Sequence, residues 1–329
     1  MSTARHSQRL HLDTDFAGDP DDACALAMVL GWPGLEVVGI TTTADPDGRR
    51  AGYVAHVLAM LGCADIPLAV GAEVSGTTGR AMGAIPDHER FWGTTEYPPP
   101  RPRVRDAAVD LLDASIERGA TIAAIGPYTN LADLERARPG RLADARVVVM
   151  GGWLDPLGPQ FPAWGPSRDW NVVCDLDAAE TVASRAGELT WVTIPGTISA
   201  QLRGRDLPRL QASGPLGRLL ARQSLAHGEV NGLPRLADEH AGLHSDLVNF
   251  HWDPVACAVA LGWEGARLDD VRVRPERRDG AMPLIRSPHG RQARVVVDVD
   301  GEVFTECWST AVEAAQRAET RQAAECDSG

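Results

Sequence analysis

The stretch that decides the fold spans residues 12–28 and reads Leu-Asp-Thr-Asp-Phe-Ala-Gly-Asp-Pro-Asp-Asp-Ala-Cys-Ala-Leu-Ala-Met. Five carboxylates lie between a short apolar run and an Ala/Leu-rich run: Asp13, Asp15, Asp19, Asp21 and Asp22. The two runs predict a strand that leads into this acidic turn and a helix that leaves it. Carboxylates crowded in this way repel one another unless a cation or a proton lies among them. We therefore expect a hard metal ion at the carboxyl end of the first strand.

The pattern of the acidic turn recurs through the first two thirds of the chain, where apolar runs alternate with helical stretches. Such alternation predicts βαβ units, a mostly parallel central sheet flanked by helices, and sites at the carboxyl ends of the strands. The expected strands are residues 9–14, 35–42, 121–125, 146–150 and 189–194. The expected helices are residues 23–30, 49–61, 107–118, 131–138 and 178–186.

The last third of the chain has a different pattern. Residues 204–251 predict a mainly helical insertion, with residues 216–227 as its clearest helix. Extended segments at residues 271–275, 292–297 and 303–305 then predict a small antiparallel part. We expect one α/β domain over residues 1–316, a Pro-rich surface connection at residues 97–102, and a flexible tail over residues 317–329.

Composition limits the function classes. The net charge of −13 argues against a nucleic-acid partner, because phosphate backbones are bound by clustered basic residues. No stretch approaches the roughly 18 apolar residues that predict a membrane span, and residues 1–9 lack the apolar core of a secretion signal. The six cysteines are scattered without C-x-x-C spacing. These features predict a cytoplasmic protein without nucleic-acid or membrane partners.

Four further segments carry oxygen ligands or sugar-binding groups and follow strands or open helices. They are Gly126-Pro127-Tyr128-Thr129-Asn130-Leu131, Met150-Gly151-Gly152, Arg168-Asp169-Trp170-Asn171 and His251-Trp252-Asp253-Pro254. Together with the acidic turn, these segments resemble the inosine-uridine-type, calcium-dependent nucleoside hydrolases, whose longer opening motif is Asp-Thr-Asp-x-Gly-x-Asp-x-Asp-Asp-Ala. The resemblance covers roughly residues 9–262, including Ile66-Pro67-Leu68-Ala69-Val70-Gly71-Ala72. It implies a nucleoside-hydrolase-like, Rossmann-related α/β fold.

The resemblance also implies roles for matching residues. Asp15 matches the catalytic base, which is also a ligand of Ca²⁺. Asp22 and Asp253 match further carboxylate ligands, and Thr129 matches the position whose backbone carbonyl binds the ion. A homo-oligomer, dimer or tetramer, is implied by the resemblance alone.

Substrate contacts follow in the same way. Asp21 and Asn171 match residues that bind the ribose hydroxyls, and Asp169 matches a glutamate at the 5′ side of the sugar. A two-residue insertion leaves open whether Asp19 or Asp21 contacts the sugar. The other expected substrate contacts are Met150, Trp170, Trp252, His251 and His88.

These residues suit the hydrolysis of an N-glycosidic bond. Ca²⁺ takes six to eight oxygen ligands, so three carboxylates and a carbonyl leave room for water and a ribose diol. A water on the ion would lose its proton to Asp15 and attack the anomeric carbon, giving ribose and a free base. Carboxylates around the sugar would stabilise the positive charge that builds up on the ring. Tryptophans in the suspected loops would stack on an extended aromatic base.

The sequence departs from the family pattern at several positions. Ala17 stands where the opening motif has Gly, and Gly18 follows one place later. Trp252 stands where many members have His before the late Asp, and His251 lies one residue earlier. The family's Gly-Asn after the second strand is replaced around Ala44-Asp45-Pro46.

Other interpretations remain open from the sequence. Asp21, Asp22, Thr129 and Asp253 are also good helix N-cap or first-turn residues. Asp13-Thr14-Asp15 is similar to the nucleophile motif of haloacid-dehalogenase-like phosphatases, although Ala17 stands where that family has Thr or Val. A calcium-dependent nucleoside- or sugar-binding protein with weak or no turnover is the non-enzymatic alternative.

Overall fold

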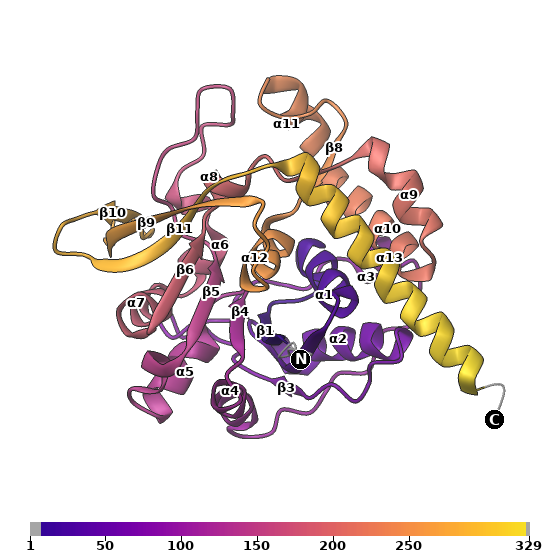
Figure 1. Cartoon of the computed structure of the whole chain (residues 1–329), viewed down its shortest axis with the longest axis horizontal. Coiled ribbons are helices and arrows are strands. Elements are labelled where there is room, and N and C mark those ends of the chain that lie inside the picture. Colours follow the sequence, from indigo (N-terminus) through magenta and orange to yellow (C-terminus); the bar gives the residue numbers. More distant parts are fainter. Residues whose placement is uncertain (1–7, 327–329) are drawn as a thin grey trace, which may run out of the picture.

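In the computed structural model, which describes residues 8–326 and the side chains of residues 8–317, the apolar runs form one nine-stranded sheet. Its strand order is β10-β9-β11-β6-β5-β4-β1-β2-β3 (Figure 1). The strands of this sheet are β1 (Gln8–Thr14), β2 (Leu35–Thr42), β3 (Leu68–Val70), β4 (Thr121–Ala124), β5 (Arg146–Met150), β6 (Glu188–Val192), β9 (Ala266–Pro275), β10 (Leu284–Arg286) and β11 (Arg291–Val299). From β3 to β11 all neighbours are parallel, and only the pairs made by β9 are antiparallel. The mostly parallel α/β fold is confirmed.

Helices cover both faces of this sheet, and a small antiparallel pair, β7 (Gln201–Arg203) with β8 (Leu247–Phe250), lies beside it. The α-helices are α1 (Asp21–Gly31), α2 (Arg49–Met60), α3 (His88–Trp92), α4 (Ala107–Glu117), α5 (Thr129–Ala137), α6 (Trp170–Cys174), α7 (Leu176–Arg185), α8 (Ile194–Thr197), α9 (Leu207–Ala212), α10 (Pro215–Val230), α11 (Leu233–Glu239), α12 (Trp252–Ala260) and α13 (Gly301–Cys326). Short 3₁₀ turns are η1 (Pro46–Gly48), η2 (Arg141–Asp144), η3 (Pro166–Arg168) and η4 (Gly204–Asp206).

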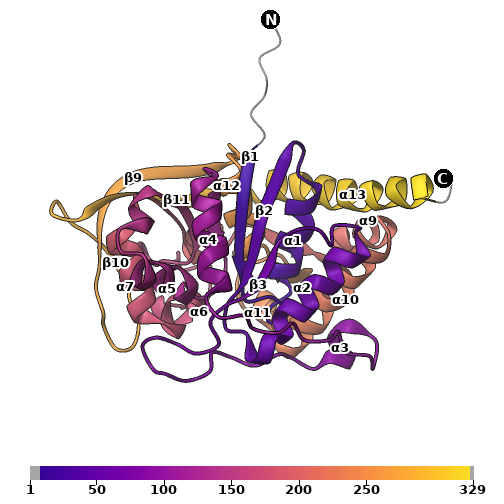
Figure 2. The same cartoon turned by 90° about the horizontal axis from the view of Figure 1, so that it is seen from below.

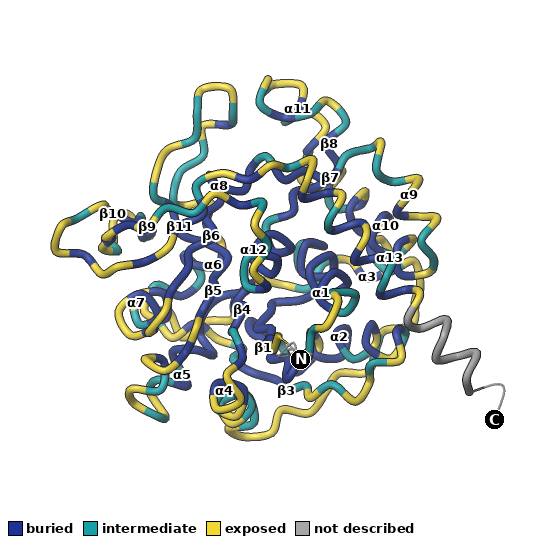
Figure 3. The backbone as a smooth tube through the Cα atoms, in the orientation of Figure 1, coloured by how far each residue is buried: buried dark blue, intermediate teal, exposed yellow. Residues whose placement is uncertain are grey.

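Alternation along the strands sends side chains into two separate cores. Leu12 of β1 and Val148 of β5 pack with α1, α2, α12 and α13. Ile122 of β4 and Val149 of β5 pack with α4, α5 and α7 on the other face. Figure 1 shows these helix groups on opposite sides of the sheet, and Figure 3 shows that its central strands are buried while the outer loops are exposed. A strand buried on both faces reads as a continuous apolar run, as observed in the sequence.

The order of the strands reverses at β1. The chain proceeds from β1 to β2 and β3 in one direction, and then returns to build β4, β5 and β6 on the other side of β1. The carboxyl ends of β1 and β4 therefore flank a topological switch point, where doubly wound sheets leave a crevice for ligands. In Figure 2 β1 begins at the upper edge, so its carboxyl end and the loop that carries α3 lie below. The acidic turn follows β1 at this point.

Helix α1 fixes the acidic turn in place because it is enclosed by α12 and α13. Its first residues, Asp21 and Asp22, are buried together with the apolar residues that follow. A Cβ on Gly31 would lie 1.8 Å from the carbonyl oxygen of Ala311, so only glycine permits the close approach of α1 and α13. Trp308 of α13 donates a hydrogen bond to the carbonyl of Cys24 at 3.0 Å.

In the last third of the chain, one sequence prediction is wrong and another is confirmed. Residues 303–305 were expected to be extended, but they lie near the start of α13, where Phe304 and Trp308 share a buried face. The small antiparallel part is confirmed, because β9 pairs antiparallel with β10 and β11, and β11 joins it to the main sheet by pairing in parallel with β6. Helix α13 also crosses the boundary expected at residues 316–317 and ends at Cys326. Among the described residues, no helix is long and apolar enough to cross a membrane.

Candidate active site

The five carboxylates of the acidic turn divide into one that faces inward and four that line a cavity. Asp13 is fully buried, and its Oδ1 accepts hydrogen bonds from Thr41 Oγ1 at 2.5 Å and Asn130 Nδ2 at 2.6 Å. Burial raises the pKa of Asp13 to about 7, against these two hydrogen bonds, which lower it. Asp13 therefore ties β1 to β2 and α5 from behind the site.

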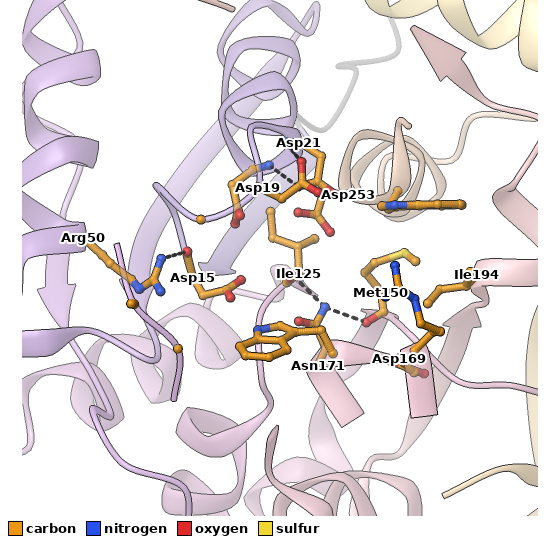
Figure 4. A pocket seen from close by; sticks show the side chains of 17 residues that line it. Asp15, Asp19, Asp21, Arg50, Ile125, Met150, Asp169, Asn171, Ile194 and Asp253 are labelled. Atoms are coloured by element: carbon orange, nitrogen blue, oxygen red, sulfur yellow. Dashed lines mark hydrogen bonds between the residues drawn. The ribbon is translucent and has the colours of Figure 1, made fainter. Parts of the chain in front are cut away.

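The other four carboxylates open into a cavity of about 410 Å³ at the switch point. This volume is within the usual range of small-molecule sites. Figure 4 shows Asp15, Asp19, Asp21 and Asp253 together in this cavity. Its lining comprises Asp15, Gly18, Asp19, Asp21, Asp22, Arg50, Gly83, Ala84, Ile125, Met150, Arg168, Asp169, Trp170, Asn171, Ile194, Trp252 and Asp253. Most of the residues predicted for the site thus come together.

Asp21, Asp22 and Asp253 form the densest carboxylate group, which we name the acidic trio. Each offers an oxygen, and these oxygens all lie within 4.8 Å of one another. Burial, and then the charges of the neighbouring carboxylates, raise the pKa of each member well above its ordinary value. Without a cation the trio would hold protons, and an ion with a preference for oxygen would displace them.

Asp15 lies immediately after β1 and is held against the loop that follows β4. A Cβ on Gly126 would lie 2.9 Å from Asp15 Oδ1 and 2.7 Å from its backbone nitrogen, so the loop can approach only because this residue is glycine. Burial raises the pKa of Asp15, and the positive charge of Arg50 opposes that shift. Asp15 is therefore a better proton acceptor than an exposed carboxylate.

Arg50 is a buried cation that the sequence analysis missed. It is 2% exposed, and its guanidinium donates to the carbonyls of Asp15, Phe16 (2.8 Å) and Ala44 (2.7 Å). In Figure 4 it lies beside Asp15. Arg50 holds the acidic turn by binding the backbone carbonyls of that turn. The local sequence at the start of α2 could not predict this role, because the contact joins residues that are far apart in the chain.

The loop after β4 presents a backbone carbonyl to the cavity, but at a different residue from the one expected. Ile125 lines the cavity, and its carbonyl accepts from Asn171 Nδ2 at 2.9 Å. Thr129, which the resemblance matched to the carbonyl ligand, lies outside the described lining, and its hydroxyl donates to Asp175 at 2.7 Å. Thr129 begins α5 and contributes to the packing of that helix rather than to the cavity.

Asn171 and Asp169 are fixed by backbone groups. Asn171 Nδ2 donates to the carbonyls of Ile125 and Met150, so its amide spans the ends of β4 and β5. Asp169 caps α6 by accepting from Val172 N–H at 3.3 Å and also accepts from Gly152 N–H at 2.5 Å. Burial raises the pKa of Asp169 to about 7, against these two hydrogen bonds. Asp169 thus closes the loop that runs from Gly152 to α6.

Asp19 connects the cavity wall to the helical insertion. Its Oδ2 lies 3.0 Å from His227 Nε2 on α10, and its Oδ1 accepts from Asn249 Nδ2 of β8 at 3.3 Å. Burial raises the pKa of Asp19, but His227 outweighs it and brings that pKa below its ordinary value. Asp19 lines the cavity as expected, with a firm anchor behind it.

His88 and His251, two expected substrate contacts, lie outside the described lining of the cavity. His88 accepts from Tyr53 Oη at 2.8 Å, donates to the carbonyl of Glu96 at 2.9 Å and stacks on Tyr97. His251 is buried with its ring centroid 4.5 Å from that of Trp308. Burial lowers the pKa of His251 to about 3, which keeps the ring neutral.

Two tryptophans line the cavity. Trp170 is 50% exposed, whereas Trp252 stacks on Phe250 with ring centroids 4.4 Å apart. Phe250 in turn contacts Trp164 edge to face at 6.1 Å. Both tryptophans that the sequence analysis placed among the substrate contacts thus line the cavity.

Comparisons with known proteins show the family that the chain matches. A family model described as inosine-uridine preferring nucleoside hydrolase matches residues 10–306. The pyrimidine-specific ribonucleoside hydrolase RihA of Citrobacter koseri is 31% identical over 228 residues, which cover 63% of this chain and 68% of that protein. RihA of Salmonella schwarzengrund is 31% identical over 221 residues, which cover 61% of this chain and 66% of that protein. The chain therefore spans about two thirds of the length of these relatives.

Solved structures give the same fold at lower identity. A purine-preferring ribonucleoside hydrolase from Gardnerella vaginalis superposes with a TM-score of 0.77 at 21% identity, covering 94% of this chain and 99% of that one. The plant nucleoside hydrolase PpNRh1 superposes with a TM-score of 0.76 at 22% identity, covering 93% and 99%. These superpositions establish the architecture around the cavity.

Proposed function

Because the chain belongs to the inosine-uridine preferring nucleoside hydrolase family, we propose that it uses Ca²⁺ to hydrolyse the N-glycosidic bond of a ribonucleoside or related riboside. The products are ribose and a free base. The observation that carries the proposal is the buried acidic trio beside Asp15 in a cavity of about 410 Å³. Three buried carboxylates at this spacing need either a bound cation or protons to offset their negative charge.

The donor set fits a hard cation. Asp15, Asp22 and Asp253 would supply carboxylate oxygens, and we propose the carbonyl of Ile125, in place of that of Thr129, as the backbone ligand. Oxygen-only coordination favours Ca²⁺ over the metals that prefer His or Cys. When bound, the ion would hold the ribose diol and lower the pKa of the attacking water.

Asp15 is the proposed general base. Burial raises the pKa of its carboxyl group above the ordinary value, which favours proton acceptance compared with an exposed carboxylate. Arg50 holds the backbone carbonyl of Asp15 and so fixes the direction of the side chain. The proton of the water passes to Asp15 as the oxygen attacks the anomeric carbon.

The sugar is positioned by groups around the base. Asn171 uses both hydrogen bonds of its Nδ2 on backbone carbonyls, which leaves Oδ1 to accept from a ribose hydroxyl. Asp21 is the proposed second hydroxyl contact, since its place in the trio brings it next to the ion ligands. Asp19 pairs with His227 and lines the cavity next to Asp21. These carboxylates also stabilise positive charge on the sugar ring during bond cleavage.

The aglycone would lie between the tryptophans. Trp170 and Trp252 line the cavity and offer flat surfaces to a base. His251 is enclosed by Trp308 and Phe304, so we do not assign it the protonation of the leaving base. We also propose that the enzyme is a homo-oligomer, which the resemblance supports, and that it is cytoplasmic, which the composition supports.

The test is a panel of inosine, adenosine, uridine and cytidine, assayed for free ribose with added Ca²⁺ and with a strong chelator. We expect at least one nucleoside to be cleaved with Ca²⁺ and turnover to be lost with the chelator. Binding of nucleosides in the presence of Ca²⁺ without any ribose release would instead indicate a binding protein. Release of phosphate from a phosphoester without ribose release would indicate a phosphatase and overturn the proposal.

A further inference from the structure

Arg168 is a cation at the cavity that has no anionic partner among the side chains of residues 8–317. Six carboxylates line the cavity, together with only two arginines, Arg50 and Arg168. The Nε and Nη1 groups of Arg50 donate to the backbone carbonyls that it holds, and this cation is buried. Arg168 is exposed, and within residues 8–317 its side chain makes neither an ion pair nor a hydrogen bond.

The aromatic cluster beside the cavity holds the guanidinium of Arg168 in place. Its Cζ lies 5.0 Å from the centroid of the Trp164 ring, and Trp164 packs on Phe250, which stacks on Trp252. A guanidinium on an indole face keeps its edge, with the N–H groups, directed away from the ring. Arg168 is thus restrained without being neutralised.

The neighbouring acid does not serve as the partner. Asp169 follows Arg168 directly, but its carboxylate is buried and accepts the N–H groups of Gly152 and Val172. Although Asp169 lines the cavity, its carboxylate is therefore engaged by the backbone of its own loop. The surface arginines elsewhere offer a contrast, since most of them pair with exposed carboxylates, as Arg286 does with Asp155 at 2.8 Å.

From these observations we propose that Arg168 binds an anionic group of the substrate, so that the preferred riboside carries a phosphate or a carboxylate. The planar fork of an arginine pairs with either group through two parallel N–H···O bonds. This inference rests on the proposed function and specifies its substrate class. Hydrolysis itself is unchanged: water adds to the anomeric carbon, the bond to the base nitrogen breaks, and the base leaves with a proton.

Two sources of the anion share this chemistry, a 5′-phosphate on the ribose and a carboxylate on the base. The experiment compares uridine and inosine with their 5′-monophosphates and with orotidine, in the presence of Ca²⁺. Wild-type protein is measured beside Arg168→Gln, Arg168→Lys and the control Arg267→Gln, which removes an exposed arginine of β9. Binding of ribose, ribose 5-phosphate and orotate is measured separately by calorimetry, so that one readout does not depend on turnover.

We expect Arg168→Gln to lower kcat/KM for an anionic riboside by at least about 10-fold, with uridine and inosine changed less than about 3-fold. Arg168→Lys should recover part of the loss, and Arg267→Gln should behave as wild type. A loss confined to the monophosphates, with weaker ribose 5-phosphate binding, assigns a 5′-phosphate. A loss confined to orotidine, with weaker orotate binding, assigns a base carboxylate.

Equal effects of Arg168→Gln on neutral and anionic ribosides, or no effect on either, would overturn the inference. Cleavage of neutral nucleosides alone by the wild type would also overturn it and leave the proposed function intact. If no riboside is cleaved, the proposed function fails. The calorimetric comparison of ribose with ribose 5-phosphate and of wild type with Arg168→Gln then still decides whether Arg168 binds an anion.

Discussion

Calcium binding and protonation should be tightly linked in this protein because of the acidic trio. The carboxylate oxygens of Asp21, Asp22 and Asp253 lie within 4.8 Å of one another. Two unit charges at that distance repel by about 3.5 kcal/mol at an effective dielectric constant of about 20. Three ionised groups would together cost about 10 kcal/mol, which is comparable to the whole stability of a typical domain. Burial and mutual repulsion therefore favour protons on the trio in the free protein.

Binding of Ca²⁺ should release those protons. We expect one to two protons to leave per ion near pH 7, so the Kd for Ca²⁺ should fall about 10- to 100-fold per pH unit in that region. Calorimetric titration in two buffers with different ionisation enthalpies measures the number of protons directly. Asp253→Asn should release fewer protons and bind the ion more weakly, and the exposed control Asp144→Asn should match the wild type.

The same shifts set the sign of the pH dependence of stability without the ion. The folded pKa of each trio member is raised above its unfolded value. The contribution of the trio to the free energy of unfolding is therefore fully present below the unfolded pKa, near 4. It is lost as the pH rises through the folded pKa. With a chelator, Tm should fall from pH 5 towards pH 8, and the increase in Tm caused by Ca²⁺ should grow over that range. Ion binding without proton release, together with a chelated Tm that does not fall, would refute this reasoning.

Two further substitutions test local features of the site. Ala17 adopts a φ of 69°, a left-handed conformation that favours glycine. Ala17→Gly should therefore raise the free energy of unfolding, measured by urea titration, by about 0.5–1 kcal/mol. A decrease would show that the backbone is not strained at this residue. Trp170 is half exposed in the cavity, so Trp170→Ala should lower kcat/KM for the best nucleoside by about 10-fold with little change in Tm, whereas unchanged kcat/KM would remove this ring from base recognition.

Local patterns were sufficient to predict the centre of the fold. The β-branched run at residues 35–42 and the run at residues 146–150 form strands with the expected bounds, because both are buried on two faces and no other element suits such a run. The prediction of a strand at residues 303–305 was wrong because Val303 and Thr305 favour strands locally. Packing of Phe304 and Trp308 against α1 and α12 decides for helix instead, and that contact is invisible in a short window.

The acidic residues of the site were predictable because a carboxylate side chain can bind a cation or accept a proton. Asp15, Asp22 and Asp253 meet in the cavity as the resemblance implied. The carbonyl of Ile125 was not predictable in the same way, since every residue has a carbonyl and only the bend at Gly126 decides which one faces inward. The sequence predicted no role for Arg168, because its lack of a partner among the described side chains is a property of the folded protein.

The most direct test of the central claim separates ion binding from catalysis at Asp15. Asp15→Asn keeps the size of the side chain and an oxygen ligand but loses the proton acceptor. With Ca²⁺ at saturating concentration, we expect single-turnover release of ribose from the best nucleoside to slow by at least about 10²-fold, while Ca²⁺ still raises the Tm of the variant. Ribose release at the wild-type rate by Asp15→Asn, or undiminished release by wild type in strong chelator, would contradict the mechanism.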